Sequence, residues 1–252
     1  MALEIVAAGA ARLGIPVSPE QLTTLARYIE LLAARNQQLN LTRIVDPTEV
    51  ERRHLLDSLT CALPVLDTLK AGAAWRVLDV GSGGGLPGLP LAIVFPRLRV
   101  TLLESAGKKA AFLREVVDAL GLAQVTVTSA RAEDAARAPD ARDSYDLVVA
   151  RALAPLPVAL ELCLPFVRPG GVLVLPRGSD LAEQLAAGED AAQELGASLR
   201  TPIPLNDPDL PPGRSLVVAD KLEPTPERFP RRPGMAAKRR AVRHGANSQP
   251  DA

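Results

Sequence analysis

Cysteine, histidine and aromatic residues are all scarce in this chain of 252 residues, which has 2 Cys, 2 His and 3% aromatic residues. Two cysteines cannot form a disulfide framework, so we expect a reducing compartment, namely the cytoplasm. The few histidines and cysteines are too widely scattered to bind a metal ion together, and we predict no metal site. Because aromatic side chains are rare, Leu, Val and Ala must fill most of the core.

Long hydrophobic runs and a secretion signal are also missing. The first residues, MALEIVAAGAARLGI, have Glu4 where a signal peptide has a basic residue, and Arg12 interrupts their short apolar stretch. A membrane-spanning helix needs about 20 consecutive apolar residues. We therefore expect no secretion and no membrane association. Nothing in the sequence demands more than a monomer.

An excess of charge of either sign is absent, since 29 Lys and Arg balance 29 Asp and Glu. The distribution is uneven, however, because the basic residues of one stretch near the C-terminus have no acid among them: Arg228, Arg231, Arg232, Lys238, Arg239, Arg240 and Arg243. We expect residues 223–252 to form a basic, disordered tail. Such a tail either binds an RNA backbone without sequence preference or only keeps the protein soluble.

Residues 1–70 show a helical pattern and no strand pattern. A capping box, SPEQ at 18–21, places Pro19 at the first helical position, and DPTE at 46–49 repeats the device. Leucine and isoleucine follow the first cap at helical spacing. We predict a helical extension over residues 1–70 that precedes a larger domain over residues 71–222.

Residues 71–222 alternate between apolar runs and helical segments. The predicted strands are 76–80, 99–104, 125–130, 145–151 and 171–176, and the predicted helices are 87–95, 107–121, 131–137, 155–167 and 181–195. This alternation predicts βαβ units and a doubly wound, mostly parallel sheet of an α/β fold. The last two runs, 197–205 and 215–222, have no helix between them, so we expect an antiparallel pair at the sheet edge.

The stretch DVGSGGGLPG, residues 79–88, joins the first predicted strand to a helix. Its glycines, among them Gly81 and Gly83, let a ligand approach the main chain, and the helix start offers free N–H groups. Such a loop either binds a nucleotide-type ligand or only packs the helix on the strand. Its pattern also fits the dinucleotide fingerprint, but Asp79 would repel a pyrophosphate.

Acidic residues at the ends of successive predicted strands indicate which ligand this is. Asp79 can attract an ammonium group, Glu104 can accept hydrogen bonds from both ribose hydroxyls, and Glu133 follows the third strand, where adenine binds. S-adenosylmethionine combines an ammonium, a ribose and an adenine without any phosphate. We therefore predict S-adenosylmethionine as the cofactor.

Several motifs together resemble the ribosomal RNA small subunit methyltransferase G family, also called the glucose-inhibited division protein B family. They are NQQLNLTRI (36–44), RRHLLDSL (52–59), DVGSGGGLPGLPLAI (79–93), LLESAGKKAAFLREV (102–116), SARAED (129–134) and DLVVARALAPL (146–156). The resemblance covers about residues 15–222. It implies a class I S-adenosylmethionine-dependent methyltransferase fold, Rossmann-like, with an N-terminal helical extension. It also implies methylation of guanine N7 in the decoding-region loop of 16S rRNA, in the small ribosomal subunit or its precursor.

The resemblance assigns roles to individual positions. Those assigned to the cofactor are Gly81, Gly83, Leu86, Glu104, Ala132 and Glu133, while Arg151 lies beside both cofactor and substrate in the family's pattern. Asn40, His54 and Asp57 match the N-terminal motifs, which the resemblance leaves without a defined role. The basic tail inherits nothing from the family.

The chemistry needs few catalytic side chains, because guanine N7 carries a lone pair and no proton. Methylation there requires no general base, only reactants held in line at attack distance. Arg151 is our candidate catalytic residue, which would contact guanine O6 or a nearby phosphate and leave N7 free. The alternative for Arg151 is a structural salt bridge at a strand end.

The remaining candidates have two interpretations each. His54 and Asp57, one helical turn apart, either brace the extension against the cofactor site or form a buried polar pair. Asn40 caps a helix or closes a lid. Lys108 and Lys109 either contact RNA phosphates or belong to a solvated helix face.

Two other functions stay open at this point. The same fold could methylate a different RNA, a protein or a small molecule, because the fold alone does not fix the substrate. A protein of another class, a non-catalytic ribosome assembly factor, would be favoured by an altered methyl-donor site, but the glycine loop is intact.

Overall fold

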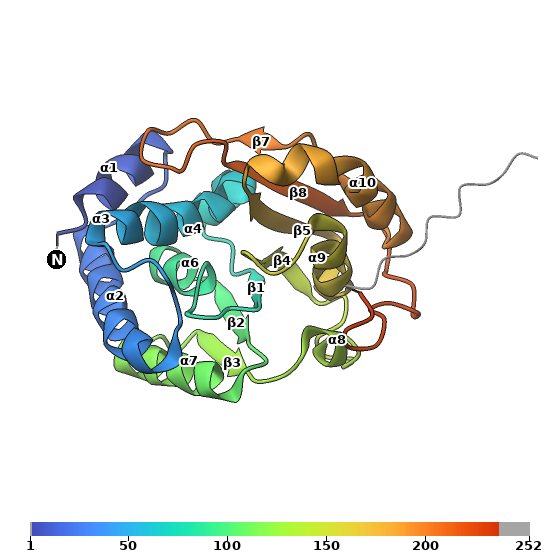
Figure 1. Ribbon diagram of the computed structural model, residues 1–252, viewed down its shortest axis with the longest axis horizontal. Coiled ribbons are helices and arrows are strands. Elements are labelled where there is room, and N and C mark those ends of the chain that lie inside the picture. The colour runs from blue at the N-terminus through green and yellow to red at the C-terminus, as the bar shows by residue number, and fades with distance from the viewer. Residues whose placement is uncertain (1, 237–252) are drawn as a thin grey trace, which may run out of the picture.

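The computed structural model describes residues 2–236, and its centre is one mixed sheet (Figure 1). The sheet has 8 strands in the order β3-β2-β1-β4-β5-β8-β6, and β7 pairs with β8 beside this order. Strands β1 to β5 pair in parallel, whereas β8 is antiparallel to β5, β6 and β7. The predicted doubly wound, mostly parallel sheet with an antiparallel edge is therefore confirmed.

The strand boundaries follow the apolar runs of the sequence. They are β1 (Arg76–Val80), β2 (Arg99–Leu103), β3 (Val125–Thr128), β4 (Tyr145–Val149), β5 (Val167–Arg177), β6 (Ala197–Leu199), β7 (Ile203–Pro204) and β8 (Ser215–Lys221). The predicted edge pair forms, with the last strand in sequence inserted next to β5. This position gives β8 partners on both sides, which suits its nearly continuous apolar sequence.

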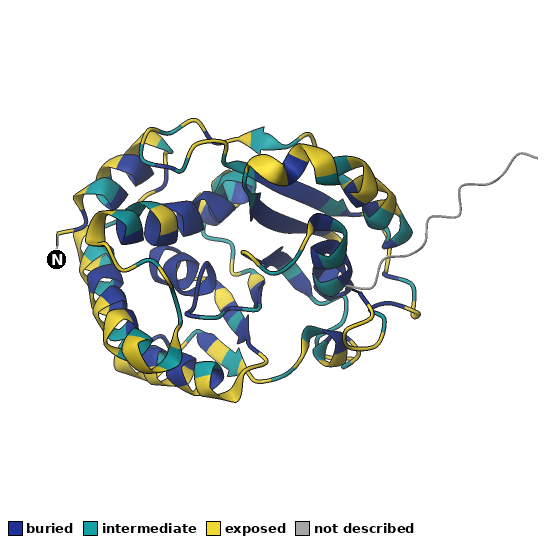
Figure 2. Cartoon of the chain, in the orientation of Figure 1, coloured by how far each residue is buried: buried dark blue, intermediate teal, exposed yellow. Residues whose placement is uncertain are grey.

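Helices cover both faces of the sheet, and in the central strands alternate residues enter two different hydrophobic clusters. In β1, Val77 belongs to the cluster under the N-terminal helices, α6 and α7, while Leu78 and Val80 belong to the cluster under α9 and α10. Burial on both faces is visible along the central strands in Figure 2. The helices of the strand-helix units are α6 (Gly88–Val94), α7 (Gly107–Ala119), α8 (Ala132–Ala135), α9 (Leu156–Cys163), η3 (Leu164–Phe166), η4 (Ser179–Gln184) and α10 (Leu185–Glu194).

The first 70 residues are helical, as predicted. Their elements are α1 (Glu4–Arg12), α2 (Pro19–Leu39), α3 (Pro47–Val50), the π-helix η1 (Glu51–Leu56), α4 (Asp57–Leu59), η2 (Thr60–Val65) and α5 (Leu66–Lys70). Ser18 and Gln21 form the predicted capping box, and Asp46 caps α3. These helices share one hydrophobic cluster with α6, α7 and the sheet, so the extension is packed onto the domain rather than separate from it.

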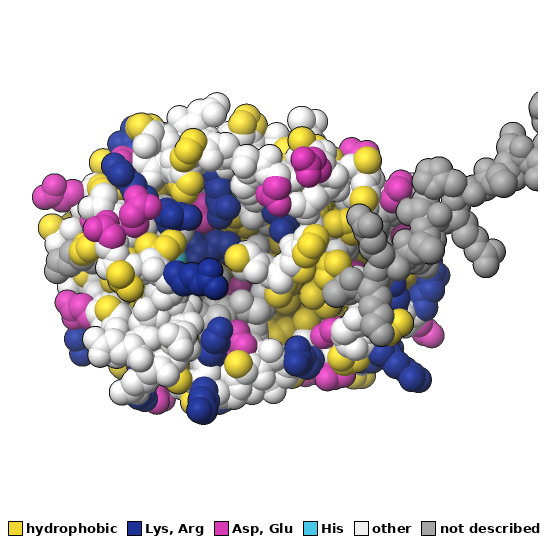
Figure 3. All heavy atoms as spheres, viewed as in Figure 1, with side chains coloured by type: hydrophobic (Ala, Val, Ile, Leu, Met, Phe, Trp, Pro, Cys, Tyr) yellow, Lys and Arg dark blue, Asp and Glu magenta, His cyan; other side chains and the backbone are white. Residues whose placement is uncertain are grey.

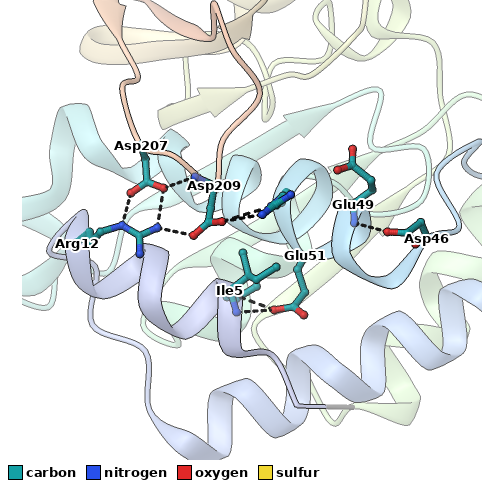
Figure 4. Close-up of polar contacts among 9 residues, drawn as sticks. Ile5, Arg12, Asp46, Glu49, Glu51, Asp207 and Asp209 are labelled. Carbon is teal, nitrogen blue, oxygen red and sulfur yellow. Dashed lines mark hydrogen bonds and ion pairs between the residues drawn. The ribbon is translucent and has the colours of Figure 1, made fainter.

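An ion-pair network connects the N-terminal helices to the loop between β7 and β8 (Figure 4). Arg12 donates to Asp207 at 2.8 Å and to Asp209 at 2.6 Å, and Arg52 lies 3.2 Å from the same Asp209. Glu51 accepts the backbone N–H groups at the start of α1. The loop that ends at residue 214 is thereby fixed against α1 and η1.

The segment 223–236 packs against the domain, which corrects our expectation that the tail is disordered from residue 223 onward. Phe229 is buried, Arg142 donates to the carbonyls of Thr225 and Phe229, and Arg231 pairs with Glu161 of α9 at 2.5 Å. These buried partners offset the entropy of ordering the segment, and only the rest of the predicted tail, 237–252, lies outside the described residues. Within residues 2–236 no helix is long and apolar enough to span a membrane.

Candidate active site

The glycine loop after β1 is held by a carboxylate from the end of β2. The Oε2 of Glu104 accepts the N–H of Gly83 at 2.9 Å, and its Oε1 accepts the N–H of Ala106 at 2.7 Å. Gly83 has a φ of +57°, and a Cβ there would meet only the carbonyl oxygen of Gly81, at 3.9 Å. The protein thus leaves open space above Gly83, on a backbone conformation that favours glycine. Glu104 is buried and directly follows β2, beside the loop, and its contact with ribose hydroxyls stays a prediction.

Asp79 lies beneath the same loop and is fully buried. Its Oδ2 accepts the N–H of Gly88 at 3.0 Å, while its Oδ1 has no hydrogen-bond partner among the described residues. Burial raises the pKa of Asp79 to about 7. Because the carboxyl is inaccessible, it offers no surface for the direct contact with an ammonium group that the sequence suggested. Gly88 permits this arrangement, since a Cβ there would lie 2.8 Å from Oδ2.

The third acidic position lies at the start of α8, beyond β3. Glu133 is buried, and its Oε1 accepts the backbone N–H of Gly234 at 3.3 Å. Ala132 is the first residue of α8 and is half-buried. The C-terminal segment therefore reaches the place where the sequence analysis expected adenine.

Arg151 follows β4 and joins the sheet to the helical extension. Its Nη1 donates to the carbonyl of Arg53 at 2.6 Å and to Asp57 Oδ2 at 3.3 Å, and its Nη2 lies 3.4 Å from His54 Nδ1. Asp57 is bound more tightly by Arg214, whose Nε and Nη2 each donate at 2.6 Å. For His54 and Asp57 the sequence left open a brace against the cofactor site or a buried polar pair; both are buried, and both contact Arg151.

His54 is buried in the π-helix η1, a type of helix that is frequent at functional sites. Burial, and next the charge of Arg151, lower the pKa of His54 to about 4, so its ring is neutral at physiological pH. A neutral ring whose Nδ1 faces an arginine accepts there and donates from Nε2. Nε2 donates to Thr42 Oγ1 at 2.7 Å. The side-chain amide of Asn36 in turn binds both the backbone N–H and the backbone carbonyl of Thr42.

The remaining predicted residues lie around this edge in different settings. Asn40 ends α2 in a left-handed conformation with a φ of 49°, which is a helix-capping role. Leu86 is buried within the glycine loop. Lys108 and Lys109 occupy the first turn of α7, directly after Ala106, and Lys108 is exposed. They flank the Glu104 end of the site without touching Arg151.

Several residues of the site were not found from the sequence. Arg177 ends β5 and Arg214 directly precedes β8, both far along the chain, and no local motif marks them. Tyr28 donates from its hydroxyl to the carbonyl of Gly84 at 2.8 Å, which braces the glycine loop from α2. The helical periodicity of α2 could have indicated that Tyr28 is buried, but not what it contacts.

Figure 3 shows basic side chains gathered around a hollow near the middle of one face, with a histidine at its edge. The described elements thus bring a glycine loop, two buried carboxylates and a cluster of arginines to the carboxyl edge of one parallel sheet. In open α/β sheets this edge is where ligands bind.

Solved structures with similar folds define the class of protein. A mutant of MtNAS in complex with S-adenosylmethionine matches with a TM-score of 0.52 and 17% identity, covering 79% of this chain and 76% of that one. A putative sarcosine dimethylglycine methyltransferase from Galdieria sulphuraria matches with a TM-score of 0.50 and 17% identity, covering 72% and 76%. The fold is that of the class I S-adenosylmethionine-dependent methyltransferases.

Sequence comparison then defines the family. The model of the rRNA small subunit methyltransferase G family matches residues 21–203. The proteins named ribosomal RNA small subunit methyltransferase G from Roseiflexus sp. (strain RS-1) and Deinococcus radiodurans are 44% and 43% identical. The first alignment covers 90% of this chain and 94% of the relative, and the second covers 92% and 90%. The chain belongs to the rRNA small subunit methyltransferase G family, which confirms the resemblance found in its motifs.

Proposed function

We propose that this enzyme transfers the methyl group of S-adenosylmethionine to N7 of a guanine in 16S rRNA of the small ribosomal subunit. The observation that carries the proposal is the meeting of the glycine loop and Arg151 at one sheet edge, in a chain of this family. A ribosomal substrate supports a cytoplasmic enzyme. A monomer is sufficient, since all the groups invoked come from one chain.

The residues of the loop fit S-adenosylmethionine. The open space above Gly83 admits a ligand close to the backbone, and Glu104 can accept ribose hydroxyls on lone pairs that its two amide partners leave free. Asp79 lies beneath the loop with its Oδ1 unpartnered among the described residues, and its carboxyl, when ionised, favours a ligand with an ammonium group. Ala132 and Glu133 lie where the adenine would end.

S-adenosylmethionine supplies a sulfonium methyl group, which is a strong electrophile. The lone pair of guanine N7 forms the new bond to carbon while the electrons of the broken S–C bond return to sulfur. No proton leaves N7, so the protein needs to orient the base and not to deprotonate it.

Arg151 is the residue that we assign to the base. Three of the five N–H donors of its guanidinium face Arg53, Asp57 and His54, which leaves two without a partner among residues 2–236. Those donors can reach guanine O6 while N7 stays free. His54 holds no proton to spare at Nδ1, so it orients Arg151 and does not act as an acid.

The test is transfer of a labelled methyl group. Purified enzyme is incubated with methyl-labelled S-adenosylmethionine and small ribosomal subunits from cells that lack the activity, and the RNA is digested to nucleosides. We expect label in 7-methylguanosine with the wild type, and a loss of label with Arg151→Met. Label in another nucleoside, or none at all, would contradict the proposal.

A further inference from the structure

Three arginines lie close together at one corner of the sheet, the place where β4 and β5 end and β8 begins. Arg177 is the last residue of β5, and its Cα pairs with Ser215, the neighbour of Arg214 in the chain. Arg151 follows β4 by two residues, and β4 runs parallel to β5 on the other side. The strand register alone therefore brings Arg151, Arg177 and Arg214 together.

Side-chain contacts confirm that the three guanidinium groups are neighbours. Arg151 and Arg214 donate to the same carboxylate oxygen, Asp57 Oδ2, at 3.3 Å and 2.6 Å. Arg177 donates from Nη1 to the carbonyl of Ala154 at 2.7 Å, in the loop that Arg151 begins. Burial, together with the nearby charge of Arg214, lowers the pKa of Arg177.

The charges at this corner do not balance. Asp57 is the one buried carboxylate that accepts hydrogen bonds from these arginines within the described chain, and both Arg151 and Arg214 already use it. Buried Asp79 interacts with Arg151 through its charge alone. Asp180 is the other acid near Arg177, but it is exposed and bound by Gln184. The three cations thus outnumber the two buried carboxyls around them, which leaves room for a further negative charge.

Two of these arginines also have donor nitrogens without a hydrogen-bond partner among the described residues. The Nε of Arg177 is buried and has no partner among residues 2–236. The Nη1 of Arg214 also has none in that part of the chain, because only its Nε and Nη2 grip Asp57. A buried donor without a partner destabilises the protein. An anionic ligand with several acceptor oxygens would satisfy both the charge and the donors.

We propose that Arg177, together with Arg214, binds a phosphate of the RNA next to the guanine that receives the methyl group. Guanidinium forks match phosphate oxygens in geometry and remain charged at every physiological pH. The proposal rests on the proposed function, because it takes the RNA as the substrate. In this proposal Arg177 and Arg214 fix the backbone of the nucleotide while Arg151 contacts its base.

The test measures KM and kcat for small ribosomal subunits with Arg177→Met. We expect KM to rise about tenfold, kcat to stay within about twofold and the affinity for S-adenosylmethionine to stay unchanged, because one charged phosphate contact is lost. A plot of log KM against log salt should lose about one unit of slope. Arg177→Lys should recover part of the loss in KM, since it restores the charge but not the fork.

Arg99→Met serves as the matched control. Arg99 is exposed at the start of β2, on the opposite edge of the sheet, and its removal should change neither KM nor the salt slope. A second readout does not depend on catalysis: inorganic phosphate should raise the Tm of the wild type more than that of Arg177→Met.

The possible outcomes separate this inference from the proposed function. Unchanged KM and salt slope in Arg177→Met would overturn the inference. So would a lower Tm and weaker S-adenosylmethionine binding with an unchanged slope, since these would show that Arg177 only supports the fold. If the wild type methylates no RNA, the proposed function fails, and the Tm shift with phosphate still decides whether the corner binds an anion.

Discussion

The guanidinium of Arg151 and the imidazole of His54 are paired through Nη2 and Nδ1 at 3.4 Å, and the other ring nitrogen, Nε2, is hydrogen-bonded to the hydroxyl of Thr42. This chain links a loop of the helical extension to the residue that we assign to the substrate. The ring is neutral, which lets it accept from an arginine on one side and donate to a hydroxyl on the other. The extension therefore holds in place the residue that we propose for the base.

The first prediction concerns His54. Replacing it with Ala should lower kcat about tenfold or more with little change in KM for S-adenosylmethionine, because Arg151 loses one of the contacts that orient it. His54→Gln, whose amide can accept from Arg151 and donate to Thr42, should recover part of kcat. Equal losses in both variants, or a loss confined to KM, would contradict an orienting role.

Arg151 and Asp57 should respond differently to substitution. Removal of Arg151 leaves Asp57 paired with Arg214, so Arg151→Met should keep its Tm while methyl transfer falls strongly. Asp57→Asn leaves arginines without their buried partner, so we expect about 2–4 kcal/mol of lost stability. Thermal and denaturant unfolding measure the contrast. A large drop in stability for Arg151→Met would make that residue structural.

Gly83→Ala should weaken S-adenosylmethionine binding by about tenfold or more, because the added methyl enters space that the protein leaves open above the loop. The left-handed backbone costs a further 1–2 kcal/mol or so of stability. Gly121→Ala is the matched control: its φ is +64°, nothing lies within 4 Å of its Cβ, and it is distant from the loop. It should lose similar stability and no affinity. Calorimetric titration that finds equal affinities in the two variants would remove Gly83 from the cofactor site.

The pKa of Asp79 makes cofactor binding depend on pH. Burial raises that pKa from 3.8 to about 7, so the carboxyl gains its charge as the pH rises through neutrality. The affinity for S-adenosylmethionine should then increase several-fold between about pH 5.5 and pH 7.5, where an α-amino group stays largely protonated. 5′-Methylthioadenosine, which lacks the ammonium group, should show no such increase, and Asp79→Asn should abolish it.

The same raised pKa has the opposite effect on the stability of the protein without its cofactor, which falls as the pH rises. Unfolded Asp79 releases its proton near pH 3.8 and folded Asp79 only near 7, so its contribution to stability is present at low pH and is lost between these values. Asp79→Asn should therefore gain stability relative to the wild type as the pH rises from about 5 to about 8. A constant difference across this range would show that Asp79 is ionised throughout.

The sequence predicted what local patterns determine. Apolar runs located the strands and capping residues located helix starts, while the cofactor position suggested by the glycine loop stays a prediction. Arg214 and Arg177 escaped notice because Arg214, just before β8, and Arg177, at the end of β5, come near Arg151 only when the strands pair. The burial of Asp79 was missed for a related reason: the sequence shows the carboxylate before the loop but not the loop folded over it.

Our prediction of disorder for the C-terminal segment was wrong because it relied on composition and gave too little weight to two individual side chains. Phe229 and Arg231 stand in a stretch that is rich in proline and arginine, yet each finds a buried partner, and Gly234 reaches Glu133. The density of charge predicted disorder, whereas the buried ring of Phe229, the pair of Arg231 with Glu161 and the donors of Arg142 hold the segment on the domain.

The final prediction separates this segment from the rest of the tail. A protein that ends at Ala236 keeps Phe229 in the core and Arg231 on Glu161, so its Tm should equal that of the full chain. A protein that ends at Leu222 loses both and leaves donors of Arg142 without the carbonyls they bind, so its Tm should fall by about 5–10 °C. It should also bind S-adenosylmethionine more weakly, since Gly234 no longer holds Glu133. If both truncations match the full chain in Tm and in cofactor affinity, the segment contributes neither to the fold nor to the site, and the contact with Glu133 has no role in binding.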